Sequence, residues 1–261
     1  RLDEASPKTE VGRLTESLNS MLGRIEESFA VRAKSESKLR RFVADASHEL
    51  RTPLTAIRGF AELHRQGAVT GEEKTKELIG RIEKESIRMG SLVEDLLMLA
   101  RLDQGPELSK DPVDISHLIY EAAESARAAG PGHPITVAVP NELFVLGDSM
   151  RIHQAIANLL ANARTHTPAG TNIAVNAETN DGETFVTVSD DGPGLSKEDQ
   201  ERIFERFFRA DPSRKRTSGE GSGLGLAIVD AVMKAHGGSV TVASEVGKGA
   251  AFTLHFPIKK N

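Results

Sequence analysis

The chain has 261 residues, 38% of them hydrophobic, which is enough to bury the core of one or two domains. Its formal net charge is -5 and its single dense basic run lies at 214–216. Nucleic-acid binding requires clustered Lys and Arg, so we expect no nucleic-acid partner. The absence of cysteine excludes disulfides and suits a reducing compartment, with the cytoplasm as the default. No apolar run is long enough for a membrane helix.

Apolar residues recur every three or four positions through the first hundred residues. One such seam occupies 11–29, slackens through the polar run 32–38 and resumes at 39–57, which predicts two successive helices. After a break at 67–71, a further apolar face occupies 78–99, so we expect a helical hairpin. A hairpin alone has too little core. It should therefore pair with a second copy to form a four-helix bundle, which makes the chain a homodimer.

The periodicity changes after Gly105, where short β-rich runs alternate with helical stretches and predict an α/β sandwich. The β-rich runs lie at 135–139, 144–146, 172–177, 185–188, 239–243 and 251–256, and the helical stretches at 116–128, 150–164 and 224–235. Only a short turn at 180–182 separates two of these runs. At least part of the sheet should therefore be antiparallel.

The string SHELRTPL, at 47–54, lies inside the first hairpin helix. Pro53 has no amide hydrogen to donate, so the helix should bend after His48. A neutral imidazole is a nucleophile near pH 7, and Glu49 is the nearest carboxylate that could accept its proton. Thr52 lies one turn further along the same face, where its hydroxyl could orient a water. Taken alone, a surface histidine beside a helix-kinking proline is the commoner case.

Three further strings suggest a nucleotide site. Asn158 and Asn162 lie four residues apart on one face of a predicted helix, and an amide oxygen is a hard ligand that suits Mg²⁺. Asp190 opens DDGPGL at the end of a strand, where a carboxylate could accept a hydrogen bond from an exocyclic amine such as that of adenine. The glycine-rich run 219–226 leads into a helix N-terminus, which favours an anion such as triphosphate. Alone, each string could be an ordinary helix face, turn or loop.

Taken in order, these strings resemble those of the sensor histidine kinases of two-component signalling. SHELRTPL looks like the phosphoacceptor box, NLLANA the asparagine box, DDGPGL the first glycine box, IFERFF the phenylalanine box and GSGLGLAIV the second glycine box. Together they cover about residues 39–256. The segment 9–25 also looks like the second helix of a HAMP linker.

The resemblance implies that His48 attacks the γ-phosphate of ATP with Glu49 as base, and that the phosphoryl group then passes to an aspartate of a cognate response regulator. Thr52 would assist dephosphorylation of that regulator.

By the same mapping, Asn158 and Asn162 flank a Mg²⁺ ion, with Asn162 as its ligand, and Asp190 reads the adenine amine. The other nucleotide-pocket and lid residues would be Gly192, Gly194, Phe204, Phe207, Phe208, Gly221, Gly223, Leu224 and Gly225.

The implied fold is an α-helical hairpin that dimerises into a four-helix bundle, followed by an α/β sandwich ATP-binding domain of the gyrase, Hsp90 and histidine kinase type. We expect the end of a HAMP linker and a connecting helix at 1–33, the dimerisation and phosphotransfer hairpin at 34–105 and the catalytic domain at 106–261. The chain would be the cytoplasmic portion of a protein anchored in the bacterial inner membrane through segments upstream of Arg1.

Two positions depart from the family pattern. Thr165 stands where members usually carry Lys or Arg, and Arg164 or His166 could replace that phosphate contact. Ala250 follows Gly249 where Thr is usual, so one hydroxyl is missing. One alternative is an ATPase clamp of the gyrase and Hsp90 type, but the histidine-bearing hairpin distinguishes this chain from such clamps. The other is a signalling scaffold that has lost nucleotide turnover.

Overall fold

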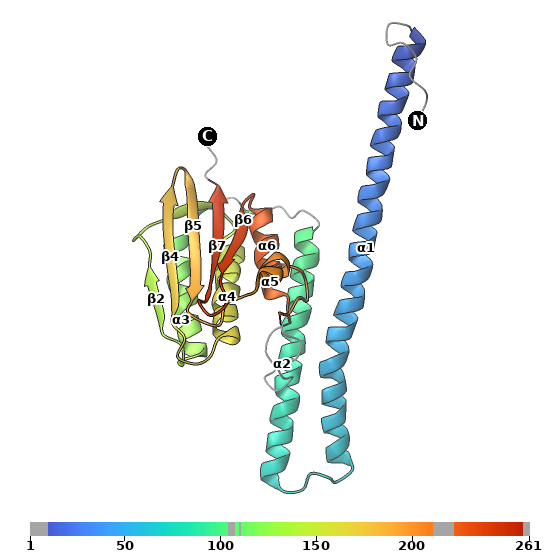
Figure 1. Ribbon diagram of the computed structural model, residues 1–261. Helices are drawn as coiled ribbons and strands as arrows, with labels where there is room; N and C mark the ends of the chain where they lie inside the picture. Colours follow the sequence, from blue (N-terminus) through green and yellow to red (C-terminus); the bar gives the residue numbers. More distant parts are fainter. Residues whose placement is uncertain (1–9, 104–107, 110, 211–221, 258–261) are drawn as a thin grey trace. The chain divides into compact units, whose positions relative to one another are not determined.

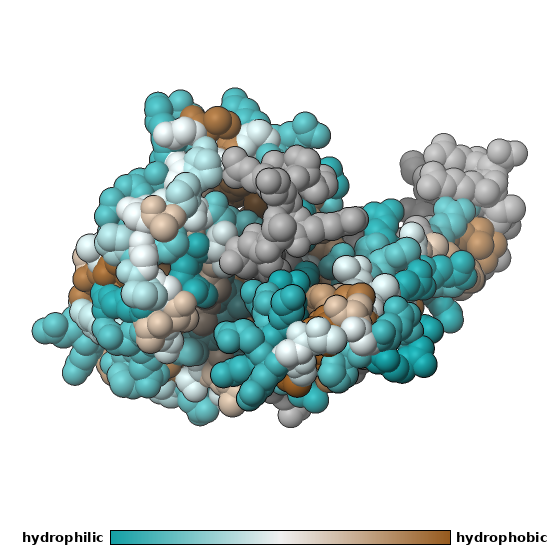
Figure 2. Space-filling model, turned by 90° about the horizontal axis from the view of Figure 1, so that it is seen from below, coloured by the Kyte–Doolittle hydropathy of each residue, from teal (hydrophilic) through white to brown (hydrophobic). Residues whose placement is uncertain are grey.

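The computed structural model describes residues 10–103, 108–109, 111–210 and 222–257 (Figure 1). Its contacts divide the chain into two compact units, Arg1–Thr55 and Ala56–Asn261, with the boundary inside helix α1 (Glu10–Arg65). Among the described helices, none has the length and apolar character needed to cross a membrane. On the face shown in Figure 2, hydrophilic residues predominate and hydrophobic ones form separate patches.

Helix α1 is continuous through the polar run 32–38, so the predicted division into two helices was wrong. The run contains neither Gly nor Pro, and its Arg, Ala, Lys and Glu residues are strong helix formers. A surface ion pair between Arg40 and Glu36 spans one turn here, with an N–O distance of 2.7 Å. The slackened apolar seam therefore reflects solvent exposure and not a helix end.

Helix α2 (Glu72–Asp103) begins after the glycine-flanked connection at 67–71, as the sequence predicted. Gly67 and Gly71 both have positive φ, of 70° and 94°, a backbone conformation that glycine adopts without steric cost. The buried positions of α2 are Leu78, Leu92, Met98, Leu99 and Leu102.

The predicted α/β sandwich is confirmed. A five-stranded sheet has the order β2-β4-β5-β7-β6, and a separate two-stranded sheet pairs β1 with β3. Only β2 and β4 pair in parallel within the larger sheet, and its other neighbours are antiparallel. The strands are β1 (Asp111–Asp114), β2 (Ile135–Ala138), β3 (Phe144–Gly147), β4 (Ile173–Asn180), β5 (Glu183–Asp190), β6 (Ser239–Ser244) and β7 (Ala250–Pro257).

The predicted turn between β4 and β5 is a two-residue hairpin. Asp181 and Gly182 both have positive φ, of 49° and 85°, as a type I′ turn requires. This turn sets the register that pairs Ile173 with Asp190 at the far end of the hairpin. A turn at one end of the sheet thus positions a candidate site residue at the other.

Helices α3 (Ile115–Ala129), α4 (Ser149–His166) and α6 (Gly225–Ala235) lie on one face of the sheet, as Figure 1 shows. Their apolar faces and the facing strand residues form a core with members including Ile152, Ile156, Leu159, Ile228, Val232, Val175, Val188 and Leu254. The short elements β1 and α5 (Lys197–Arg202) were not anticipated. Both are too short for a hydrophobic period to register.

The start of α4 is fixed from two sides. The Asp148 side chain accepts a hydrogen bond from the Arg151 amide as the N-cap of the helix. The Asp148 amide in turn donates to Nε2 of His236, at the end of α6, over 3.0 Å. Nδ1 of His236 lies 2.8 Å from the Val232 carbonyl oxygen, so the ring connects the end of α6 to the start of α4.

Helix α2 contacts the sandwich through two polar links. The Ser222 hydroxyl, just before α6, donates to Asp95 over 3.1 Å. Arg206 donates to both carboxylate oxygens of Asp103, over 2.6 and 2.8 Å. Burial raises the pKa of the Asp95 carboxyl above its ordinary value of 3.8, and the Ser222 hydrogen bond opposes that rise.

Replacing Leu159 by alanine should lower the free energy of unfolding by about 2–5 kcal/mol, because the substitution opens a cavity in the core. Leu159 is fully buried on α4. Urea denaturation measures the loss. Met150→Ala is the matched control on the same helix, since Met150 is 72% exposed, and it should change the free energy by less than about 0.5 kcal/mol. Equal losses in the two variants would contradict the packing described here.

Asp95→Asn should gain stability relative to the parent as the pH rises from below 3.8 to neutrality. A carboxyl whose pKa is raised by folding contributes stability that is present below the unfolded value and is lost as the pH rises through the folded value. The amide keeps an acceptor for Ser222 and carries no charge at any of these pH values. Urea denaturation across this range measures the difference, and a difference that does not change with pH would contradict the burial of this carboxylate.

Candidate functional site

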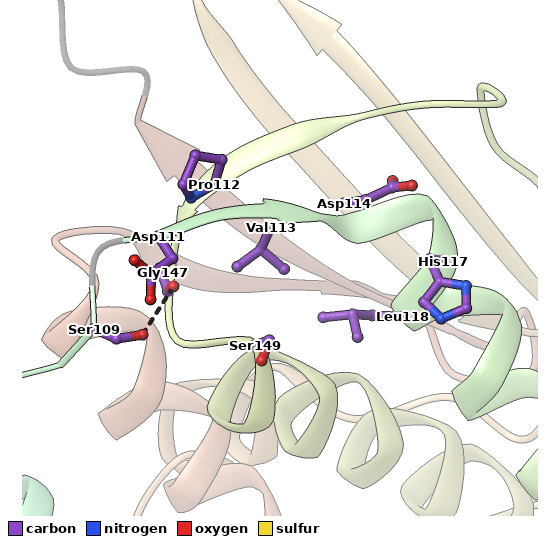
Figure 3. Close-up of a pocket in the computed structure, with 9 residues that line it drawn as sticks. All are labelled: Ser109, Asp111, Pro112, Val113, Asp114, His117, Leu118, Gly147 and Ser149. Carbon is purple, nitrogen blue, oxygen red and sulfur yellow. Dashed lines mark hydrogen bonds between the residues drawn. The ribbon is translucent and has the colours of Figure 1, made fainter.

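A cavity of ≈ 350 Å³ lies between β1 and the start of α4 (Figure 3). Val113 and Leu118 point into this space, whereas Asp114 points to the opposite side of β1. Asp114 caps α3 by accepting from the Ser116 amide, and Ser109 donates to the Gly147 carbonyl over 3.5 Å. Asp114 and Ser109 therefore serve local structure here.

The larger cavity, of ≈ 700 Å³, lies where α4, α6, the end of β5 and α2 meet. Seven of the residues proposed from the sequence line it: Asn158, Asn162, Asp190, Gly194, Phe208, Gly223 and Gly225. The motifs are far apart in the chain, so their convergence on one space is the main finding about the site. A cavity of this size suits a small-molecule ligand.

Asn158 and Asn162 share one face of α4 and are both half-buried in the cavity wall. The Asn158 amide donates to the carbonyl of Gly225 over 3.3 Å, which leaves its side-chain oxygen outside that bond. Amide oxygens at this spacing fit a hard cation such as Mg²⁺ if phosphate oxygens complete its coordination.

The N-terminus of α6 opens on the same cavity, with Gly223, Gly225 and Leu226 in its wall. Side chains cap α3, α4 and α5, but no side chain caps α6 at Leu224. The exposed amide groups and the helix dipole of such an end favour an anion. This geometry fits the phosphate groups of a nucleotide.

The structure distinguishes the two adjacent aspartates of DDGPGL. Asp191 accepts hydrogen bonds from the backbone and side-chain amides of Asn172, both over 2.7 Å, and these bonds lower its pKa. Asp190 is half-buried in the cavity wall, where burial raises its pKa against the opposing hydrogen bonds from the amides of Gly192 and Ala250. Of these two aspartates, Asp190 is therefore the one whose carboxylate a ligand in the cavity can reach.

Two glycines allow backbone segments near Asp190 to approach each other closely. Gly249 has φ of 82°, and a Cβ atom there would lie 1.9 Å from the Asp190 carbonyl oxygen. Gly194 has φ of 70°, and a Cβ atom there would lie 2.1 Å from the Glu245 carbonyl oxygen. A side chain at Gly249 would push its backbone away from Asp190, and a side chain at Gly194 would push its backbone away from Glu245. Ala250, the position of the missing hydroxyl, lies in the cavity wall beside Asp190.

Four proposed residues lie outside the cavity wall. Leu224 is fully buried, Phe204 packs edge to face on Phe252, and the amide of Gly192 donates to Asp190 over 2.9 Å. Phe207 has φ of 60°, and its amide donates to the carbonyl of Gly223. These residues support the loops of the site. Gly221 lies outside the described residues.

The cavity wall also contains charged residues that the motifs did not reveal. Lys84, Arg88 and Asp95 come from α2, and Arg209 follows the phenylalanine box. The regular spacing of the three α2 residues was visible in the sequence, but nothing in the sequence indicates that this helix face meets the cavity.

Arg164 and His166, the two candidates for the phosphate contact missing at Thr165, differ in whether they reach the cavity. Thr165 and His166 line the cavity, but Arg164 does not. Its guanidinium donates to the carbonyl of Ala129, at the end of α3, over 2.7 Å. Arg164 is therefore engaged elsewhere in the fold.

His48, Glu49 and Thr52 belong to the other compact unit. His48 is exposed on α1, Glu49 is half-buried, and the helix continues past the buried Pro53. The Thr52 hydroxyl donates to the carbonyl of His48 over 3.3 Å. The imidazole is therefore accessible on the helix surface.

Residues 38–105 match the model of the His Kinase A phospho-acceptor domain, and residues 147–260 match that of the histidine kinase-, DNA gyrase B- and HSP90-like ATPases. The second match supports ATP as the ligand of the cavity. The first separates the chain from the gyrase and Hsp90 clamps, which was the competing interpretation of the C-terminal half.

The chain is 46% identical to the probable sensor histidine kinase TcrY of Mycobacterium tuberculosis, over 98% of this chain and 53% of TcrY. It spans about half the length of the curated relatives it matches. The structure of full-length ShkA in complex with AMPPNP is 35% identical, with a TM-score of 0.63 over 84% of this chain and 46% of ShkA.

The structure of histidine kinase ThkA in complex with the response regulator protein TrrA is 25% identical, with a TM-score of 0.69 over 87% of this chain and 64% of that one. Two domain models, these relatives and the shared fold agree. The chain therefore belongs to the sensor histidine kinases of two-component systems.

Proposed function

We propose that this chain binds ATP with Mg²⁺ in the larger cavity, transfers the γ-phosphoryl group to His48 and passes it to an aspartate of a cognate response regulator. The convergence of Asn158, Asn162, Asp190 and the α6 N-terminus on one cavity carries the proposal. The similarity to ShkA, solved with AMPPNP, and to ThkA, solved with a response regulator, supports it.

Each group in the cavity has a role that its chemistry suits. Asp190 accepts a hydrogen bond from the adenine amine, because its carboxylate is the one that faces the ligand. Asn162 binds Mg²⁺ with Asn158 beside it, and the α6 N-terminus binds phosphate. The Mg²⁺ ion, when bound, neutralises charge that develops on the phosphate oxygens.

In the transfer step, a nitrogen of the neutral His48 ring forms a bond to the γ-phosphorus while the bond to the bridging oxygen breaks, and ADP leaves with that electron pair. Glu49 accepts the proton of the ring and keeps the imidazole neutral after attack. The exposed position of His48 allows a catalytic domain and a regulator to approach it in turn.

A regulator aspartate then attacks the phosphorus and displaces the imidazole. Thr52 assists the opposing reaction, in which the phosphate on the regulator aspartate is hydrolysed. Its hydroxyl proton is donated to the His48 carbonyl, but its oxygen can still accept a hydrogen bond from a water and aim that water at phosphorus.

The proposed organisation keeps a HAMP end at 1–33, the hairpin at 34–105 and the catalytic domain at 106–261, in a homodimer whose parent protein is anchored in the membrane. Large apolar side chains exposed on the two hairpin helices support the dimer, since a four-helix bundle would cover them. They include Leu39, Val43, Leu54, Leu63, Ile79, Ile87, Val93 and Leu97.

Incubation with γ-labelled ATP and Mg²⁺ should label the parent chain with an acid-labile, alkali-stable phosphate, and His48→Gln should abolish the label because glutamine has no nucleophilic ring nitrogen. His64→Gln is the matched control, since His64 is also exposed on α1 and should stay dispensable. Label that survives in His48→Gln would overturn the assignment.

Asn162→Asp should abolish labelling while the chain remains folded, because it replaces a neutral Mg²⁺ ligand by a charge next to the triphosphate. Autoradiography measures the loss and circular dichroism checks the fold. Asn176→Asp, on an exposed position of β4, makes the same chemical change away from the cavity and should leave labelling intact. Full labelling of Asn162→Asp would remove this residue from the metal site.

A further inference from the structure

A triphosphate in the larger cavity needs more positive charge than helix α4 provides. The phosphates remain anionic even with Mg²⁺ bound, and a half-buried anion without cationic partners is costly. On α4, Thr165 is uncharged and Arg164 donates to the Ala129 carbonyl instead of lining the cavity. The remaining cations of the wall must supply the charge.

Helix α2 places two cations in that wall. Lys84 and Arg88 lie four residues apart, hence on one helix face, and both line the cavity together with Asn158 and Asn162. The same stripe continues one and two turns further along α2 through Ser91 and Asp95. Helix α2 therefore forms one wall of the cavity and presents its cations on that side.

Arg88 is only partly committed to a partner within its own helix. Its guanidinium lies 3.8 Å from a carboxylate oxygen of Glu85, beyond hydrogen-bond distance. That oxygen is buried and makes no hydrogen bond. The Arg88 side chain is 30% exposed, so its remaining donors can reach a ligand without a large desolvation cost.

The sandwich and α2 are linked at the C-terminal end of this stripe. Ser222 donates to Asp95, and Arg206 donates to Asp103 two turns further along α2. The other charged or titratable groups in the wall are His166, Arg209 and Asp190. In the proposed site the adenine lies at Asp190, so the phosphates of the ligand lie near α4 and α2.

We infer that Lys84 and Arg88 of α2 bind the phosphate groups of ATP and thereby make α2 part of the nucleotide site. The inference rests on the proposed assignment of the cavity to ATP. It implies that a bound triphosphate bridges α2 and the ATP-binding domain, whereas a nucleoside without phosphates does not.

The test measures binding of ATP and of adenosine to the full chain by isothermal titration calorimetry. Lys84→Gln/Arg88→Gln should weaken ATP roughly tenfold at low salt, as expected when charge-assisted contacts are lost, and should leave adenosine unchanged. The salt dependence of ATP binding should also fall. Arg88→Lys should retain most of the affinity, and adding Thr165→Lys to the double variant should restore it, since Thr165 lines the same cavity.

Arg81→Gln is the matched control, because Arg81 is exposed on α2, pairs with Glu77 over 2.7 Å and does not line the cavity. Thermal unfolding without nucleotide establishes that each variant is folded. Unchanged ATP binding in the double variant, or equal weakening of ATP and adenosine, overturns the inference. Asn162→Asp distinguishes a failure of this inference from a failure of the proposed ATP site. If Asn162→Asp abolishes ATP binding and the double variant does not weaken it, the cavity remains the ATP site and only the role of α2 is wrong. Retained ATP binding in Asn162→Asp removes the site itself.

Discussion

The close approach of two backbone segments beneath the cavity is the constraint on which the site depends. β5 and β7 pair up to Asp190 and Ala250, and there the backbone at Gly249 comes so near the Asp190 carbonyl that no side chain fits between them. Gly194 allows the same closeness to Glu245. Because both segments are held at this distance, Asp190 is fixed in the wall by the amides of Gly192 and Ala250. The end of the site that we propose for adenine is thus held by backbone contacts on both strands.

The end that we propose for the phosphates is built differently. It combines side chains of α4, the uncapped start of α6 and one face of α2, which are joined by a few polar links such as Ser222 to Asp95. The Arg206–Asp103 ion pair is partly exposed and therefore contributes little stability, whereas the Ser222–Asp95 hydrogen bond is part-buried.

Features that depend only on residues close together in the chain could be predicted from the sequence. The spacing of Asn158 and Asn162 follows from the helix period, and the turn at Asp181 and Gly182 follows from residues that tolerate positive φ. The single long α1 was misjudged because an exposed polar run resembles a break when only apolar periodicity is followed. The positions of Lys84 and Arg88 in the cavity wall and the contact of Arg164 with Ala129 could not be predicted, since they depend on tertiary contacts between segments far apart in the chain. The support roles of Phe204 and Leu224 also depend on packing and not on motif membership.

In the proposed function, ATP bound among Asn158, Asn162 and Asp190 phosphorylates His48. Peptide mapping by mass spectrometry, performed at neutral to alkaline pH after incubation with ATP and Mg²⁺, tests it most directly because it locates the phosphate on the chain. We predict phosphate on the peptide that contains His48 and none on peptides that contain the other histidines. Phosphate on a different residue, or no phosphopeptide from a chain that binds ATP, would contradict it.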